Sequence, residues 1–221
     1  MSTRIRLAGC EDVAGITAIY APIVRNTHLS AEFVVPTIAE MHRRIVETLA
    51  THPWLVAERE GEIAGFTYGT RFRARPAYQW TAEVSVYIRA DHHRRGLGRA
   101  LYASLFECLL VQGFTQAIAV IALPNPPSVS LHESLGFVPV GVFPSVCFKS
   151  VAKPPPNAHG MDARKNSSDP SLEDGLWYDI GWWRLLLAGQ PSPPPTLRTP
   201  SELAGTIEWN TAIATGMKKS E

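Results

Sequence analysis

The chain has 221 residues, of which 45% are hydrophobic and 19% are charged, and its formal net charge is +1. The length suffices for one well-packed domain with appendages, and the near-neutral charge excludes a general affinity for polyanions such as nucleic acid. Cys10, Cys108 and Cys147 lack metal-ligand spacing and indicate reduced thiols, and no apolar run reaches the length of a membrane span. We therefore expect a cytoplasmic protein without a metal, a nucleic-acid partner or a membrane anchor.

The first half of the chain predicts alternating strands and helices. Apolar periodicity marks, in chain order, a strand at 5–7, helices at 16–23 and 38–49, and strands at 54–58 and 63–68. Pro22 should end or kink the first helix because it lacks a backbone N–H. The polar turn at 59–62 is typical of a hairpin between the two strands that flank it.

The second half continues the alternation and then changes character. The pattern predicts, in order, a strand at 81–89, a helix at 101–110, a buried strand at 117–123, a short helix at 129–135, and strands at 137–142, 145–149 and 177–183. Residues 150–175 have few apolar side chains and predict a flexible insertion into a single domain over 1–190. The Pro-rich tail at 191–221 predicts an extended or disordered segment.

The most specific feature is the segment from Asp91 to Leu101, Asp-His-His-Arg-Arg-Gly-Leu-Gly-Arg-Ala-Leu, between a predicted strand and a predicted helix. Its glycines let the backbone approach a ligand closely, and free amides at a helix N-terminus point at negative charge. Arg94, Arg95 and Arg99 add cations at the same place. The segment therefore predicts a pyrophosphate site, the alternative being a surface turn with solvated arginines.

Arg-Arg-Gly-x-Gly-Arg-Ala resembles the coenzyme A pyrophosphate loop of the GNAT superfamily of N-acetyltransferases. His93 stands in the position that this superfamily fills with Gln or Arg. A histidine can still donate a hydrogen bond there.

Two side chains are candidates for proton transfer. Glu83 shares a strand face with Ser85 and Tyr87, and a carboxylate beside a thioester can accept the proton that an ammonium must lose before it attacks. His132, in the predicted short helix, is a candidate for a second proton acceptor or for the donor to a departing thiolate. The alternatives are a solvent-facing glutamate and a helix histidine bonded to solvent or backbone.

Four further side chains are candidates for binding. Asn125 could hydrogen-bond an amide of a pantetheine arm, or it could be only a turn residue between prolines. Arg73, Arg75 and Tyr78 precede Glu83, and arginine binds carboxylates and phosphinates through two parallel hydrogen bonds. They are candidates for holding an anionic group of a substrate, the alternative being an exposed basic loop.

Several motifs together resemble the phosphinothricin acetyltransferase family within the GNAT superfamily. They are 53–58 (Pro-Trp-Leu-Val-Ala-Glu), 78–83 (Tyr-Gln-Trp-Thr-Ala-Glu), 86–88 (Val-Tyr-Ile), 96–98 (Gly-Leu-Gly), 119–125 (Ala-Val-Ile-Ala-Leu-Pro-Asn), 127–133 (Pro-Ser-Val-Ser-Leu-His-Glu) and 177–183 (Trp-Tyr-Asp-Ile-Gly-Trp-Trp). The resemblance covers residues 3–149 and 176–190. It implies an α/β fold whose mixed, twisted sheet splays open midway, with helices on both faces and acetyl-CoA in the splay.

The resemblance also assigns roles. Glu83 and His132 match the catalytic glutamate and histidine of the family. The acetyl-CoA contacts would come from Val86, Tyr87, Ile88, Arg94, Arg95, Gly96, Leu97, Gly98, Arg99, Ala100 and Asn125. Family members acetylate the amino group of phosphinothricin, methionine sulfoximine or methionine sulfone, and relatives are often homodimers. The expected activity is therefore acetyl transfer to a small amino acid or analogue by direct attack of its amine.

Departures from the family keep other functions open. Ala31-Glu32-Phe33 stands where the family commonly has an aromatic and a basic residue, and residues 150–175 interrupt a short family turn. One alternative is a catalytically inactive GNAT fold that binds acyl-CoA, which the interruption favours and the presence of Glu83 with His132 disfavours. Another is an enzyme for a protein N-terminus or a polyamine; Arg73 and Arg75 disfavour a polyamine because such a pocket needs acids.

Overall fold

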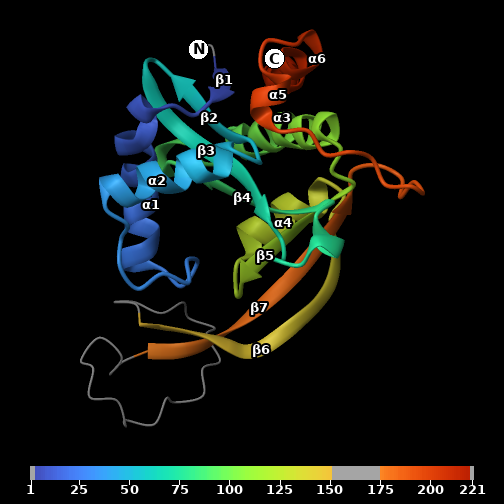
Figure 1. Cartoon of the computed structure of the whole chain (residues 1–221). Coiled ribbons are helices and arrows are strands. Elements are labelled where there is room, and N and C mark those ends of the chain that lie inside the picture. Colours follow the sequence, from blue (N-terminus) through green and yellow to red (C-terminus); the bar gives the residue numbers. More distant parts are fainter. Residues whose placement is uncertain (1–2, 151–174, 220–221) are drawn as a thin grey trace.

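The computed structural model describes residues 3–150 and 175–219. Its seven strands form one mixed sheet in the order β1-β2-β3-β4-β5-β7-β6, with helices on both faces (Figure 1). The strands are β1 (Arg4–Leu7), β2 (Trp54–Arg59), β3 (Glu62–Arg71), β4 (Thr81–Ile88), β5 (Gln116–Ala122), β6 (Val138–Ser150) and β7 (Gly175–Leu186). The helices are α1 (Val13–Asn26), α2 (Ile38–Leu49), α3 (Leu97–Gln112), α4 (Pro126–Ser134), α5 (Pro200–Leu203) and α6 (Ile207–Ala214). The predicted α/β class with a mixed sheet is confirmed.

The sheet opens between its two central strands. β4 and β5 run parallel, and within the described strands their pairing ends at Glu83 and Ile118. β4 nevertheless continues to Ile88, still paired with β3, and β5 continues to Ala122, still paired with β7. Because each strand follows a different neighbour beyond Glu83, a gap opens between them, as the resemblance implied.

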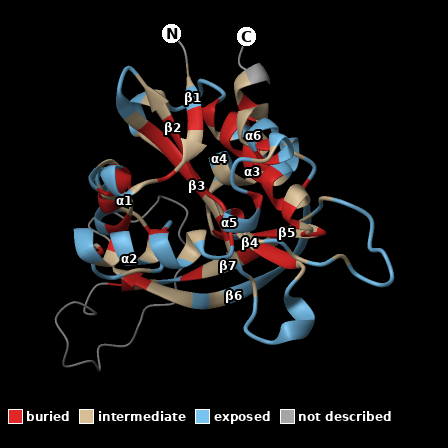
Figure 2. Cartoon of the chain, turned by 45° about the horizontal axis from the view of Figure 1, so that its top comes forward, coloured by how far each residue is buried: buried red, intermediate tan, exposed pale blue. Residues whose placement is uncertain are grey.

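Each face of the sheet has its own core. On one face, α1 and α2 pack over the aromatic side chains of β2 and β3. On the other, α3, α4 and α6 cover the small and branched side chains of the central strands. Figure 2 shows the buried strands in the middle and the exposed outer sides of the helices around them. Glu83 lies on the α1–α2 face and is half-buried, so the alternative of a solvent-facing glutamate does not hold.

Helix α1 does not end at Pro22 but continues to Asn26. Proline removes one hydrogen bond within the helix. Beyond it, however, Val24 is almost completely buried against the sheet. Burial of the apolar face keeps this turn helical, since tertiary packing supplies most of the stability of a helix in a protein.

The predicted disorder of the tail over 191–221 is wrong for most of this segment. Residues 200–219 form α5, α6 and a 3-10 turn (Thr215–Lys219) that pack on α3 and β1. Leu203 and Trp209 are each 1% exposed. The Gly216 amide donates to Ser104 Oγ, which donates in turn to the Ile213 carbonyl. Composition suggested disorder because the few apolar residues here are buried only by elements distant in the sequence.

The predicted insertion at 150–175 lies almost entirely outside the described residues. Its two flanks belong to paired strands, since β6 ends at Ser150 and β7 begins at Gly175, and these two residues are register partners. Among the described residues, no helix combines the length and the apolarity that crossing a bilayer requires.

The buried histidine between α2 and β2 makes stability depend on pH. Burial, aided by the positive charge of Arg71, lowers the pKa of His52 from 6.5 to about 4. Between these values the unfolded chain binds a proton that the folded protein excludes, so stability is full above pH 6.5 and declines as pH falls. We expect His52 alone to remove about 2 kcal/mol of the unfolding free energy between pH 7.5 and pH 5.

Urea unfolding of the wild type and of His52→Gln at both pH values checks this prediction. The glutamine keeps a polar side chain without a titrating group, so the variant should lose less stability on acidification. His28 and His132, whose pKa values burial also lowers, remain in both proteins and serve as the common background. Equal losses in the two proteins would contradict the assignment.

Candidate functional site

Glu83 stands at the point where the sheet divides. It is opposite Thr70 of β3 on one side and beside Ile118 of β5 on the other. Burial raises the pKa of its carboxyl group, and the positive charge of Arg73 lowers it in part. A carboxylate with a raised pKa is a better proton acceptor, which suits a general base.

Beyond Glu83, alternate residues of β4 turn their backbone toward the gap. The Arg89 amide donates to Ala64 of β3. Because backbone groups alternate in direction along a strand, those of Val84, Val86 and Ile88 face away from β3. The Val84 amide still belongs to the last pair with β5, and the backbone groups of Val86 and Ile88 face the open edge. Of the three predicted pantetheine contacts, Val86 and Ile88 therefore point to the gap, and the backbone of Tyr87 points to β3.

The predicted anion turn joins β4 to α3 as expected. Gly96 has φ +75°, a left-handed conformation that favours glycine, and α3 begins at Leu97. The Ala100 amide is bonded to the Gly96 carbonyl, so helix geometry leaves the amides of residues 97–99 without an intrahelical partner. Arg94 and Arg95 are exposed beside them. The turn thus combines free amides, a helix N-terminus and cations, which suits a pyrophosphate.

Two side chains of this segment are already engaged within the protein. Arg99 donates to Ser134 Oγ at 2.8 Å and so ties α3 to α4. His93 Nε2 lies 2.9 Å from the Ile88 carbonyl, where it secures the end of β4. His93, at the position where the superfamily has Gln or Arg, therefore holds the turn against β4 in this protein.

Asn125 is the N-cap of α4. Its Oδ1 accepts from the Ser128 amide at 3.3 Å, which accounts for an asparagine between prolines on structural grounds. Its side-chain amide nitrogen remains a donor near the C-terminal end of β5. The binding role of Asn125 stays a prediction.

His132 lies in α4 and is buried, with a polar partner at each ring nitrogen. Nδ1 is 2.7 Å from the Ser128 carbonyl, which can only accept, so Nδ1 carries the proton. Nε2 then accepts from the hydroxyl of Tyr102 at 2.9 Å. Burial lowers the pKa of His132, although the Ser128 carbonyl opposes this in part. The backbone bond that the sequence analysis gave as the alternative is present at Nδ1, and the tyrosine at Nε2 was not expected; the catalytic role of His132 stays a prediction.

Tyr102 is the functional candidate that sequence reasoning missed. Its ring is completely buried on α3, and burial raises its pKa, so its hydroxyl stays protonated. Tyr102 and His132 are separated by 30 residues. No local pattern links them, because the contact exists only when α3 and α4 pack on the same face of the sheet.

The basic loop before β4 lies beside Glu83. The guanidinium of Arg73 stacks over Phe72 and Trp182, at 4.5 and 4.8 Å from the ring centroids. Tyr78 packs edge-on against Phe72 at 6.0 Å. Arg75 is exposed in the same loop. The aromatic side chains hold Arg73 close enough to act on the pKa of Glu83. All three predicted binding residues of this loop, Arg73, Arg75 and Tyr78, are exposed.

The described residues contain no group of three or more His, Cys, Asp or Glu side chains placed to hold a metal ion. The chemistry that this arrangement supports is proton abstraction beside an anion site. Glu83 is a candidate base, the open edge of β4 has backbone groups that a ligand can use, and the turn before α3 is a candidate anion site.

Comparison with known proteins agrees with this geometry. Residues 5–150 match the Acetyltransferase (GNAT) domain. A phosphinothricin N-acetyltransferase of Streptomyces viridochromogenes is 32% identical over 199 residues, which are 90% of this chain and 95% of that protein. Another, of Alcaligenes faecalis, is 42% identical over 147 residues, 66% of this chain and 75% of that protein.

A solved structure shows the same similarity in three dimensions. It is a GNAT superfamily phosphinothricin acetyltransferase of Sinorhizobium meliloti in complex with AcCoA. Its TM-score is 0.74 at 29% identity, and the match covers 91% of this chain and 97% of that one. The domain match, the relatives and the shared fold lead to one conclusion, that this chain belongs to the GNAT acetyltransferase family.

Proposed function

We propose that the chain transfers the acetyl group of acetyl-CoA to the amino group of a small amino acid or analogue, of the phosphinothricin, methionine sulfoximine or methionine sulfone type. The observation that carries this proposal is the position of Glu83. It is a half-buried carboxylate with a raised pKa, at the residue where β4 and β5 separate and within the electrostatic reach of Arg73.

The residues present fit acetyl-CoA as the co-substrate. The amides of residues 97–99 and the side chains of Arg94 and Arg95 would receive the pyrophosphate. The backbone of Val86 and Ile88 and the side chain of Asn125 would hold the pantetheine arm. A Cβ at Gly98 would approach Leu131 to 3.2 Å, so the first turn of α3 packs closely on α4 and leaves little room for a larger residue at this position.

Acetyl transfer then follows from proton transfer and charge stabilisation. Arg73, with Arg75 and Tyr78, holds an anionic group of the substrate and orients its ammonium toward Glu83. Glu83 accepts the proton, directly or through a water, and the neutral amine attacks the thioester in one direct step. The backbone amide of Val86 at the open edge stabilises the oxyanion. As the C–S bond breaks, the attacking nitrogen loses its second proton and the departing CoA thiolate gains one. His132, whose Nε2 is bonded to the Tyr102 hydroxyl, assists this transfer.

The test is CoA release from acetyl-CoA, followed with a thiol reagent across a panel of amines. The panel holds phosphinothricin, methionine sulfoximine, methionine sulfone, free amino acids and spermidine. We expect turnover with the amino-acid analogues and little with spermidine. Tight CoA binding without turnover of any amine would instead support the inactive acyl-CoA-binding fold, and turnover of spermidine alone would support the polyamine alternative.

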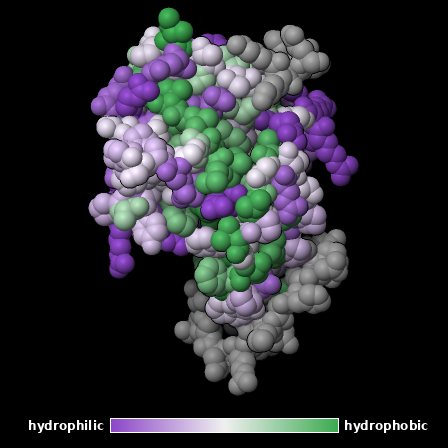
Figure 3. All heavy atoms as spheres, turned by 90° about the vertical axis from the view of Figure 1, so that its right-hand side faces the viewer, coloured by the Kyte–Doolittle hydropathy of each residue, from purple (hydrophilic) through white to green (hydrophobic). Residues whose placement is uncertain are grey.

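We also infer a homodimer in the cytoplasm. The edge strand β6 carries an unusual number of exposed apolar side chains, namely Val138, Val140, Val142, Phe143 and Val146. Figure 3 shows a band of hydrophobic residues on the face to the right of Figure 1. Exposed apolar surface of this kind marks protein contacts. Light scattering of the full chain tests the inference, with a monomer mass as the contrary outcome.

A further inference from the structure

A cavity of about 180 Å³ lies beneath α2, on the face of the sheet that carries Glu83. It is lined by Tyr20, Glu32, Met41, Arg44, Thr48, Trp54, Phe66, Tyr68 and Thr70. The proposed mechanism gives this space no role. Cavities of about 150 Å³ bind a benzene molecule, so the space suits a side chain of up to that size.

The strand register connects this cavity to the catalytic carboxylate. Thr70 and Tyr68, which line it, pair with Glu83 and Ser85 across β3 and β4. Residues directly opposite each other in an antiparallel pair project from the same face of the sheet. The negative charge of Glu83 also contributes to the raised pKa of Tyr68. A substrate whose amine meets Glu83 can therefore extend its side chain over Thr70 into the cavity.

One wall of the cavity is aromatic. Trp54 stacks on Tyr68 with ring centroids 4.2 Å apart and an interplanar angle of 19°. Trp54 is only 4% exposed. Its Nε1 is buried and, within the described part of the chain, has no hydrogen-bond partner. Because protein atoms cover this nitrogen, it does not reach a ligand in the cavity, and Trp54 contributes apolar ring surface to the wall.

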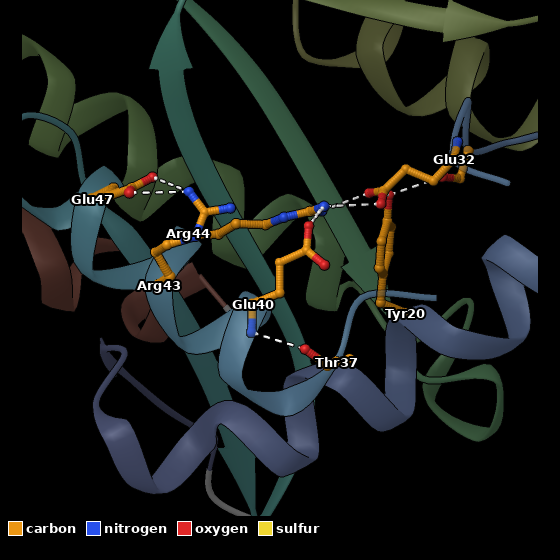
Figure 4. A network of polar contacts seen from close by, with 8 residues as sticks. Tyr20, Glu32, Thr37, Glu40, Arg43, Arg44 and Glu47 are labelled. Atoms are coloured by element: carbon orange, nitrogen blue, oxygen red, sulfur yellow. Dashed lines mark hydrogen bonds and ion pairs between the residues drawn. The ribbon is translucent and has the colours of Figure 1, made fainter. Parts of the chain in front are cut away.

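The outer wall is charged but balanced. Arg44 donates to both carboxylate oxygens of Glu32, at 2.7 and 3.0 Å, and to Glu40 at 2.6 Å (Figure 4). The hydroxyl of Tyr20 donates to the same Glu32 at 2.8 Å. Since the guanidinium is fully matched, it offers no spare cation to an incoming anion. A negatively charged side chain would lose its water here and lie beside Glu32, which is unfavourable.

We propose that this cavity is the side-chain specificity pocket of the acetyl acceptor. It selects uncharged side chains, up to the size of an aromatic ring or a methionine sulfone. This inference rests on the proposed amino-acid N-acetylation. It adds a distinction that the proposed function lacks: methionine sulfone is preferred over phosphinothricin and over glutamate, because both of the latter carry a charged side chain.

One variant and a control test the pocket in the full chain. Thr48→Phe fills the cavity from α2 and should reduce kcat/KM for methionine sulfone at least tenfold while sparing alanine. Val46→Phe, at a position of α2 that is 51% exposed, should change neither.

Calorimetric binding of methionine sulfone gives a second readout that does not depend on turnover. If methionine sulfone binds Thr48→Phe more weakly than the wild type, the pocket is supported, whether or not acetyl transfer occurs. Such weaker binding without any acetyl transfer would contradict only the proposed reaction. Turnover of amines with unchanged selectivity in a folded Thr48→Phe overturns the pocket and leaves the reaction intact. A wild type that prefers glutamate or phosphinothricin over methionine sulfone also overturns it.

Discussion

Glu83→Gln is expected to lower kcat about 10²- to 10⁴-fold, the usual contribution of a positioned general base. Glutamine has nearly the same size and can keep hydrogen bonds at the junction of β4 and β5, but it cannot accept the proton of an ammonium. The KM for acetyl-CoA should stay within a factor of two, because the turn before α3 and the open edge of β4 are unchanged. Single-turnover acetylation of the best amine in the panel measures the loss.

The pH profile separates this catalytic role from a structural one. Burial raises the pKa of Glu83, so in the wild type kcat/KM should fall as pH drops through that raised pKa and the carboxylate becomes protonated. The variant should lose this acidic limb. Glu47→Gln, an exposed position on α2, is the matched control and should retain wild-type rates. Unchanged turnover in Glu83→Gln would remove Glu83 as the base.

The second large effect is expected on stability. Trp209→Ala should lower the free energy of unfolding by about 3–5 kcal/mol, the usual loss when a buried aromatic side chain is truncated. Trp209 is 1% exposed and belongs to the core in which α6 packs against α3. Its Nε1 has no hydrogen-bond partner among the described residues, so the loss reflects packing alone.

Urea denaturation of the full chain measures the effect, and Ile207→Ala supplies the control. Ile207 is in the same helix but is 86% exposed, and such surface substitutions usually change stability by less than about 0.5 kcal/mol. Acetyl-CoA binding should also weaken in Trp209→Ala, because Gly216 follows α6 directly and packs on the first turn of α3. A Cβ at Gly216 would collide with the Ala100 carbonyl. Equal stability of the two variants would show that the C-terminal helices are only loosely attached.

Local sequence patterns predicted the elements whose signals are short-range. Alternation placed β4, and glycine spacing placed the turn that precedes α3, because both depend on neighbouring residues. Helical periodicity located α2 and α3. The family that these motifs indicated is the one that the comparisons show.

Interactions between distant elements decided the remainder. The C-terminal helices fold because Leu203 and Trp209 are buried against α3, and α1 passes through Pro22 because Val24 is buried beyond it. Local sequence predicted disorder for the C-terminal segment and a helix end or kink at Pro22. Long-range burial of apolar area outweighs local propensity, which contributes less than about 1 kcal/mol per residue for ordinary side chains.

The same division applies to the site. The sequence by itself determined the base candidate, the anion turn and the basic loop, because each is a residue type in a recognisable local pattern. Only the tertiary structure decided that His132 is a neutral partner of Tyr102, that His93 and Arg99 bond within the protein, and that a cavity with an ion-paired wall lies at Thr70, the strand partner of Glu83. Most of these contacts join residues that are distant in the sequence. Only the packing of the folded chain determines which of the many possible contacts form.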